Sequence, residues 1–211
     1  KKKTNNKVFS LLNKILNENN EIINSLNKFY IDSYSKKKVL QLKKYSEIVL
    51  IGMGGSILGA RSIYNFLKNK IKKKFFFVDD FEQINLNLKN KKKRLNLIVS
   101  KSGNTLETIS NSNILIRSSK KNIFITENKN SYLINLAKKL KSEVIYHNNF
   151  IGGRYSVLSE VGMLPAELMG LKPNKFRRLN MLVNNKKFLN SLVQNVACTL
   201  ELVKKRKYNS I

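Results

Sequence analysis

The stretch over residues 48–60 constrains the fold of this chain more than any other part of it. It opens with four apolar residues that favour a buried strand, and a helical pattern follows from Ser56. The break between the two holds three glycines, Gly52, Gly54 and Gly55. Glycines let the backbone approach a ligand closely, and the first N–H groups of a helix attract an anion. The stretch therefore predicts a strand, a tight turn and a helix that together hold a phosphate group.

From residue 48 onward, apolar runs that favour strands alternate with helical patterns. The predicted strands cover 48–51, 75–78, 95–99, 123–126 and 144–146, and the predicted helices cover 56–70, 84–90, 104–117, 132–140 and 157–169. This alternation is typical of a parallel sheet with helices on both faces. We therefore expect an α/β fold, a three-layer sandwich around a mainly parallel, doubly wound sheet, with ligands beyond the carboxyl ends of its strands.

Helical patterns flank the sheet on both sides. An apolar stripe runs through 5–18, and a long helix is predicted over 186–205. Asp32 or Ser33 is the expected cap of a further helix that contains Val39 and Leu42. We expect a helical lead-in over 1–46, the sheet domain over 47–172 and a helical segment over 173–211. Because the chain begins at lysine rather than methionine and stops without an obvious end signal, we expect it to be a fragment of a longer protein.

The net charge of +28 raises the question of a nucleic-acid or anionic-membrane partner. However, the lysines are spread through the chain among many asparagines and isoleucines, which favours a coding bias over a focused patch. The tightest basic runs, at 1–3, 36–38, 72–74 and 91–94, fall between predicted elements, where solvent surrounds them. We expect neither nucleic acid nor a membrane as partner, and no apolar run approaches the roughly 20 residues of a membrane span.

The chain contains a single cysteine, Cys198, so it forms no internal disulfide. This favours a reducing compartment, and we expect a cytoplasmic protein. Since Cys198 lies in an apolar helical stretch, we expect it to be a small core residue.

The sequence of the glycine turn is close to two nucleotide-binding motifs but matches neither. A dinucleotide-binding motif needs a glycine or alanine where Ile57 stands. One feature of the motif is present, since Asp79 ends the next strand, where an acidic residue would bind the ribose hydroxyl. A triphosphate-binding loop needs a lysine and a hydroxyl where Ala60 and Arg61 stand. Neither cofactor is therefore expected.

A second turn, over residues 100–105, carries three hydroxyl groups at a strand end and the start of a helix: Ser100, Ser102 and Thr105. Gly103 allows an unusual backbone angle between them, and Lys101 adds a positive charge. Hydroxyls together with open helix N–H groups suit a phosphate monoester and need no metal. The alternative is an ordinary serine or threonine helix cap beside a solvated lysine. The first glycine turn at the same sheet edge favours the phosphate site.

Three motifs together resemble the glucose-6-phosphate isomerase family. They are Gly-Met-Gly-Gly-Ser-Ile-Leu-Gly at 52–59, Ser-Lys-Ser-Gly-Asn-Thr-Leu-Glu-Thr at 100–108, and Gly-Gly-Arg-Tyr-Ser-Val-Leu-Ser-Glu-Val-Gly-Met-Leu-Pro at 152–165. They occur in the family's order, and the resemblance covers about residues 45–172. The second motif is shared by many sugar isomerase (SIS) domains, whereas the third is similar to the family's own signature.

The resemblance implies roles for particular residues. Gly55 and Ser56 match a pair near the sugar phosphate, and Arg154 matches the arginine that stabilises the enediolate intermediate. The matched phosphate-binding loop consists of Ser100, Lys101, Ser102, Gly103, Asn104 and Thr105. The implied reaction interconverts glucose 6-phosphate and fructose 6-phosphate through an enediol, as a step of glycolysis and gluconeogenesis, with no cofactor or metal and in a homodimer.

The chain also departs from the family's pattern. Gly103 and Asn104 stand where many members have phenylalanine and threonine, which is closer to the general SIS pattern. The family's general-base glutamate, ring-opening histidine and C-terminal lysine have no counterpart in the matched region. Glu107 and Glu160 do not match the base, and His147, the one histidine, is interpreted as a structural or edge residue. We therefore expect these residues alone to bind sugar phosphate weakly and to turn it over negligibly.

Three alternatives remain from the sequence. The chain could be a non-catalytic phosphosugar-binding SIS module of a regulator, although the first 46 residues show no clear recognition helix. It could belong to another SIS-type phosphosugar isomerase, against which the third motif argues. The third alternative, a basic protein that binds nucleic acid, is supported by the net charge alone.

Overall fold

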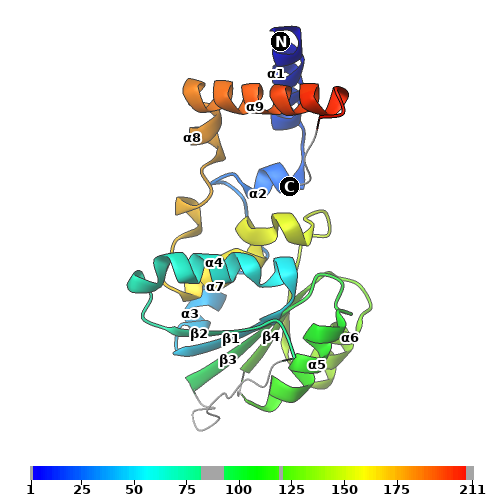
Figure 1. Cartoon of the computed structure of the whole chain (residues 1–211). Helices are drawn as coiled ribbons and strands as arrows, with labels where there is room; N and C mark the ends of the chain where they lie inside the picture. Colours follow the sequence, from blue (N-terminus) through cyan, green and yellow to red (C-terminus); the bar gives the residue numbers. More distant parts are fainter. Residues whose placement is uncertain (1, 82–92, 119–120, 208–211) are drawn as a thin grey trace. The chain divides into compact units, whose positions relative to one another are not determined.

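The computed structural model describes residues 2–81, 93–118 and 121–207 (Figure 1). The chain splits into two compact units. Ile31–Phe176 forms one unit, which contains the sheet, and Lys1–Tyr30 together with Arg177–Ile211 forms a helical unit. The division into 1–46, 47–172 and 173–211 stays a prediction.

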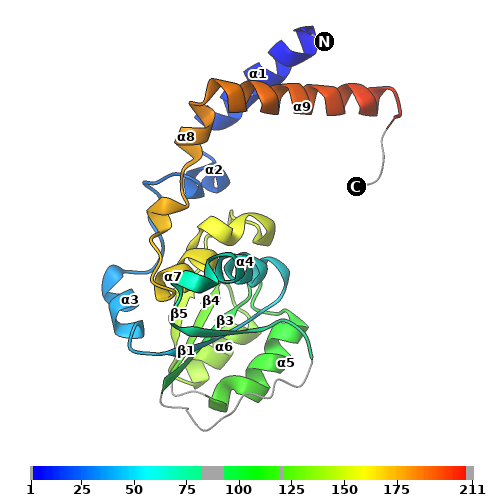
Figure 2. The same cartoon turned by 60° about the vertical axis from the view of Figure 1, so that its left-hand side comes forward.

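Within the described residues, five parallel strands form one sheet in the order β2-β1-β3-β4-β5. Their bounds are β1 Glu47–Gly52, β2 Lys74–Val78, β3 Arg94–Val99, β4 Lys121–Thr126 and β5 Glu143–Tyr146. The chain runs from β1 outward to β2, then crosses back to β3 and proceeds to β5, so the sheet is doubly wound as predicted. Every predicted strand is confirmed, and Figure 2 shows the strands side by side.

Helices cover both faces of the sheet and complete the predicted three layers. One face carries α3 (Lys36–Leu42), α4 (Leu58–Leu67) and α7 (Glu160–Leu168), and the other carries α5 (Leu106–Leu115) and α6 (Tyr132–Lys139) (Figure 1). On β1, Ile48 and Leu50 pack into the first apolar layer, while Val49 and Ile51 pack into the second. Since successive strand side chains point to opposite faces, a strand covered on both faces is expected to be mostly apolar, and the buried polar side chains of β3, Arg94 and Asn96, are hydrogen-bonded.

The ends of several helices differ from the predicted ones. The hydroxyl of Ser35 caps α3 by accepting the Lys38 amide at 3.2 Å, so the predicted caps Asp32 and Ser33 are wrong. The helix predicted over 157–169 is divided at Ser159, where a 3₁₀ segment, η5 (Gly153–Leu158), ends and α7 begins. The helix predicted over 84–90 lies outside the described residues.

The helical unit contains α1 (Lys2–Asn17), α2 (Glu21–Ser25), α8 (Leu179–Val183) and α9 (Lys186–Lys204). Val8 of α1 packs against Val193 and Ala197 of α9. Cys198 is exposed, so its predicted place in the core is wrong. The neighbouring residue on a helix is turned by about 100°, and Ala197 rather than Cys198 occupies the buried side of α9.

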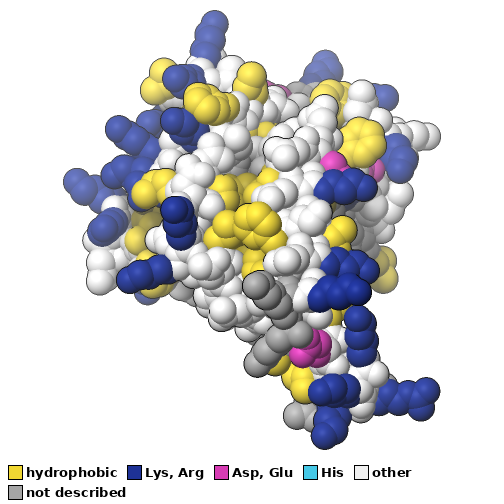
Figure 3. All heavy atoms as spheres, turned by 90° about the horizontal axis from the view of Figure 1, so that it is seen from above, with side chains coloured by type: hydrophobic (Ala, Val, Ile, Leu, Met, Phe, Trp, Pro, Cys, Tyr) yellow, Lys and Arg dark blue, Asp and Glu magenta, His cyan; other side chains and the backbone are white. Residues whose placement is uncertain are grey.

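Basic residues are dispersed over the face seen in Figure 3 and do not gather in one patch. All four basic runs reach into secondary structure rather than lying wholly in the connections where they were expected: Lys2 and Lys3 belong to α1, and Lys74 begins β2. The run at 36–38 forms the first turn of α3, and Lys38 Nζ lies 2.6 Å from the Glu143 carboxylate. Arg94 begins β3, is buried, and lies 2.9 Å from Glu47. Among the helices in the described part of the chain, none is long and apolar enough to span a bilayer.

Candidate functional site

The carboxyl ends of β1 and β3 define the candidate site. The sheet reverses its winding direction between these two neighbouring strands, and ligands of doubly wound sheets bind at such a point. The 52–56 turn follows β1, and the 100–105 loop follows β3. Two of the three sequence motifs therefore meet at one edge of the sheet.

A close approach of two glycines brings the third motif to the same place. The 52–56 turn forms a short 3₁₀ segment, η1 (Gly54–Ser56), which packs against η5. A Cβ atom on Gly55 would lie 2.2 Å from the Gly153 carbonyl oxygen, so only glycine fits at position 55. The buried Ser156 hydroxyl donates to the carbonyls of Gly55 at 3.2 Å and Gly153 at 2.8 Å. The contact places the turn of Arg154 directly against the turn of Gly55 and Ser56.

The 100–105 loop is held by its own hydroxyl groups. Ser100 is buried, and its Oγ lies 2.9 Å from the Thr105 hydroxyl and accepts the Gly103 amide at 3.2 Å. Ser102 is exposed and accepts the Asn104 amide at 3.2 Å. The side chain of Asn104 in turn accepts the Tyr132 amide at 2.9 Å, which ties the loop to the start of α6. Ser100 thus shapes the loop from inside, whereas Ser102 and Thr105 stand nearer to solvent.

Gly103 sits in the left-handed region, with φ of +66°. A Cβ at this position would lie 2.3 Å from the Ser131 hydroxyl oxygen, which caps α6. The Gly103 carbonyl accepts the Leu133 amide at 3.1 Å. Backbone angle and space both require glycine here, and the departure from the family's phenylalanine therefore fits the local geometry.

Beyond the loop, α5 begins at Leu106 without a side-chain cap, although Thr105 occupies the cap position. The N–H groups of the first turn of a helix have no partner within the helix. Together with the helix dipole, they form a place for an anion next to the hydroxyls of Ser102 and Thr105.

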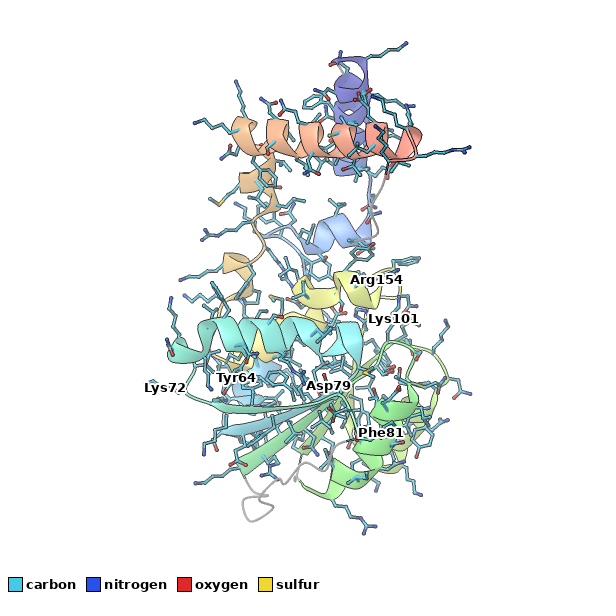
Figure 4. All side chains as sticks on the ribbon, in the orientation of Figure 1. Tyr64, Lys72, Asp79, Phe81, Lys101 and Arg154 are labelled. Carbon is cyan, nitrogen blue, oxygen red and sulfur yellow. The ribbon has the colours of Figure 1, made fainter. Side chains whose placement is uncertain are left out.

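The two basic residues predicted for the site differ in their surroundings. Arg154 on η5 is exposed, and it makes no ion pair with any residue that the structure describes. Lys101 is half-buried: its Nζ donates to the Asn149 carbonyl at 2.8 Å and lies 3.3 Å from Glu127. Figure 4 shows both residues toward the same end of the sheet-containing unit. Lys101 joins the ends of β3 and β4 to the connection after β5, while Arg154 is available to a ligand.

His147 and Glu160 form a buried pair beside the Arg154 turn. His147 follows β5 and Glu160 begins α7, and their side chains are 2% and 1% exposed. Burial by itself would raise the pKa of the Glu160 carboxyl, but hydrogen bonds from His147 and the Asn148 amide, together with the attraction of His147, bring the pKa below its ordinary value. The interpretation of His147 as a structural residue fits this geometry. Sequence reasoning missed Glu160 as its partner, because 13 residues separate the two.

Asp79, which stands where an acidic residue would bind a ribose, forms an ion pair with Arg61. Arg61 on α4 lies 2.7 Å from its carboxylate, and the same guanidinium lies over the Phe77 ring. The ion pair of Asp79 with Arg61 therefore joins the end of β2 to α4. No group of three or more metal-ligating side chains occurs in the described ranges.

Residues 1–210 match the model of the phosphoglucose isomerase family. The chain belongs to this family. Among its relatives, glucose-6-phosphate isomerase of Borrelia garinii subsp. bavariensis is 36% identical over 139 residues, which cover 57% of this chain and 26% of that protein. The glucose-6-phosphate isomerase of Methanocaldococcus jannaschii is 32% identical over 168 residues, 74% of this chain and 40% of that protein.

A solved structure of a hypothetical protein from Thermus thermophilus has the same fold, with a TM-score of 0.68. The two chains are 21% identical, and the match covers 94% of this chain and 52% of the other. The family that the three motifs resemble and the α/β sandwich expected from the strand–helix alternation are therefore confirmed. The match spans 26% of the length of the Borrelia protein and 40% of the Methanocaldococcus protein, so the chain corresponds to only part of these relatives.

Proposed function

We propose that this chain supplies the substrate-binding part of an aldose–ketose isomerase that interconverts glucose 6-phosphate and fructose 6-phosphate. The observation that carries the proposal is the contact of Gly55 with Gly153 at the carboxyl edge of β1 and β3. This contact supports one shared site for the three motifs, whose order and composition are typical of the family.

The phosphate of the substrate binds, in this proposal, at the 100–105 loop. Ser102 and Thr105 supply hydroxyls, the first turn of α5 supplies backbone N–H groups, and Gly103 and Asn104 keep the loop in shape. Ser100 fixes the loop, and Lys101 adds positive charge near it. Gly55 and Ser56 border the site on the β1 side. Binding energy from the phosphate anchors the sugar away from its reacting carbons.

Arg154 stabilises the negative oxygen of the enediolate. A guanidinium keeps its charge at every working pH and donates hydrogen bonds without taking part in proton transfer. The isomerisation also needs a carboxylate that moves a proton between two adjacent carbons. Glu127 and Glu160 lie near the site, but Lys101 binds the first and His147 binds the second. We therefore propose that the base, and with it the ring-opening histidine and the C-terminal lysine of the family, come from residues outside this sequence.

Isothermal titration with fructose 6-phosphate tests the anchor. We expect weak saturable binding, which Ser102→Asp abolishes because its carboxylate repels the phosphate. Ser62→Asp is the matched control, since Ser62 is an exposed serine on α4 away from the loop. Equal binding by wild type and Ser102→Asp would contradict the proposal.

An isomerase assay separates the enzyme from the phosphosugar-binding module of a regulator. We expect negligible turnover from the 211 residues and robust turnover from the longer gene product. Binding without turnover by the longer product would favour the module. The family resemblance also leads us to propose a homodimer in the cytoplasm, which light scattering and fractionation of the longer product would test.

A further inference from the structure

The connection over residues 147–153 leads from β5 to the turn that carries Arg154, and a buried pair of side chains fastens it. We propose that His147 and Glu160 are positioning residues that hold this connection, and through it the Arg154 turn, against Gly55. The inference rests on the proposed function, because it assigns the pair a role through Arg154.

The two side chains contact each other and two further residues of the connection. His147 Nδ1 lies 2.5 Å from Glu160 Oε1, and His147 Nε2 lies 2.9 Å from the Ile151 carbonyl oxygen. The Asn148 amide donates to the same Glu160 oxygen at 3.0 Å. One histidine and one carboxylate therefore hold the backbone at residues 148 and 151 and attach the connection to the first turn of α7.

The chemistry of these contacts makes the pair a unit. The Ile151 carbonyl and the Glu160 carboxylate both accept hydrogen bonds, so each ring nitrogen of His147 faces an acceptor. The second oxygen of Glu160 is buried without a hydrogen-bond partner among the described residues. Such burial is costly for a carboxylate, and the contacts of the first oxygen with His147 and the Asn148 amide offset part of this cost.

Forming α7 does not require this carboxylate. Ser159 already caps the helix, with its hydroxyl 3.4 Å from the Val161 amide. An exposed acidic residue in the first turn would interact with the helix dipole without any cost of burial. The side chain of Glu160 instead points inward and contacts His147 and the Asn148 amide. This indicates that Glu160 serves to hold the connection rather than to begin the helix.

From Ile151, the backbone leads directly into a turn that is hydrogen-bonded internally and to Gly55. The Tyr155 amide donates to the Gly152 carbonyl at 2.9 Å, and Ser156 donates to both Gly153 and Gly55. Lys101 adds a second fastening at the Asn149 carbonyl. The backbone on both sides of Arg154 is thus fixed before a ligand arrives, so that only side-chain rotations have to be restricted on binding.

Amide hydrogen exchange of the full 211-residue chain tests the proposal without a ligand. We expect Glu160→Gln and His147→Asn to speed exchange at residues 153–156 by about tenfold relative to the amides of β3. Glu160→Gln keeps the size and one acceptor of the side chain, so it serves even where the histidine variant fails to fold. Asn96→Leu is the matched control: Asn96 is buried and hydrogen-bonded to Leu115 and Asn122 on the other face of the sheet. Exchange that is equally fast in the control, or unchanged in the variants, would overturn the proposal.

A titration with fructose 6-phosphate tests whether the pair acts through Arg154. We expect Glu160→Gln and Arg154→Met each to weaken binding severalfold, and the double variant to bind no more weakly than Arg154→Met alone, since residues that act as one unit are non-additive. Multiplicative losses would show a structural role only and overturn the assignment. Failure of the wild type to bind would refute the proposed function, while the exchange experiment would still decide whether the pair holds the turn.

Discussion

Gly55 and Gly153 pack backbone against backbone, with 2.2 Å between the Gly153 carbonyl oxygen and the place where a Cβ of residue 55 would be. They belong to motifs that lie almost a hundred residues apart in the chain. Their contact brings the turn after β1 and the turn of Arg154 into one site, and Ser156 bonds to both carbonyls. It is also the relationship in the site that substitution can test most directly.

Gly55→Ala is expected to destabilise the chain by about 2 kcal/mol, because the methyl group would meet backbone atoms that cannot rotate away. Urea unfolding measures this loss. Gly152→Ala is the control, since its Cβ would find its nearest neighbour at 3.7 Å, in the Tyr155 ring. Equal stability of the two variants would mean that the glycine contact does not exist in solution.

Gly103→Ala combines two penalties. The left-handed angle alone costs an alanine about 1–2 kcal/mol, and the methyl group also meets the Ser131 hydroxyl. Adding Ser131→Gly removes the Ser131 part of the second penalty and leaves the Thr126 hydroxyl oxygen at 3.0 Å, while the loss of the α6 cap to glycine costs only a few tenths of a kcal/mol. We therefore expect the double variant to unfold at a higher urea concentration than Gly103→Ala and a lower one than wild type. A double variant no more stable than Gly103→Ala would contradict the clash.

The Glu160 carboxyl makes stability depend on pH with a definite sign. Its folded pKa lies below the reference value of 4.5, so its contribution is fully present above about 4.5 and is lost as the pH falls through the lower folded pKa. Glutamine cannot titrate and resembles the protonated carboxyl. The difference in unfolding free energy between wild type and Glu160→Gln should therefore shrink as the pH falls from about 5 to about 3. Thermal or urea unfolding across this range measures it, and a constant difference would contradict the lowered pKa.

The buried ion pair between Arg94 and Glu47 should matter far more than the exposed one between Lys129 and Glu127. Arg94 is 1% exposed and lies 2.9 Å from Glu47, so Glu47→Ala leaves a buried charge without this partner and should cost about 3 kcal/mol. Lys129 is 74% exposed, and Lys129→Ala should change stability by less than about 0.5 kcal/mol. Chemical denaturation compares the two variants, and similar losses would refute the distinction.

The sequence by itself determined the sheet and much of the candidate site. The strands could be predicted because a strand buried on both faces is mostly apolar, as residues 48–51 are. Gly103 and the hydroxyls around it were visible because a tight loop before a helix needs those residue types locally. Both signals depend on neighbours along the chain.

Only the tertiary structure decided how distant residues combine. It buried Arg94 against Glu47, exposed Cys198 on α9 and replaced the predicted caps of α3 with Ser35. It also paired His147 with Glu160 and packed Gly55 against Gly153. These outcomes depend on the packing of whole elements, since a charge is buried only where its partner arrives and a glycine contact forms only where two backbones meet. Local sequence patterns do not contain that information.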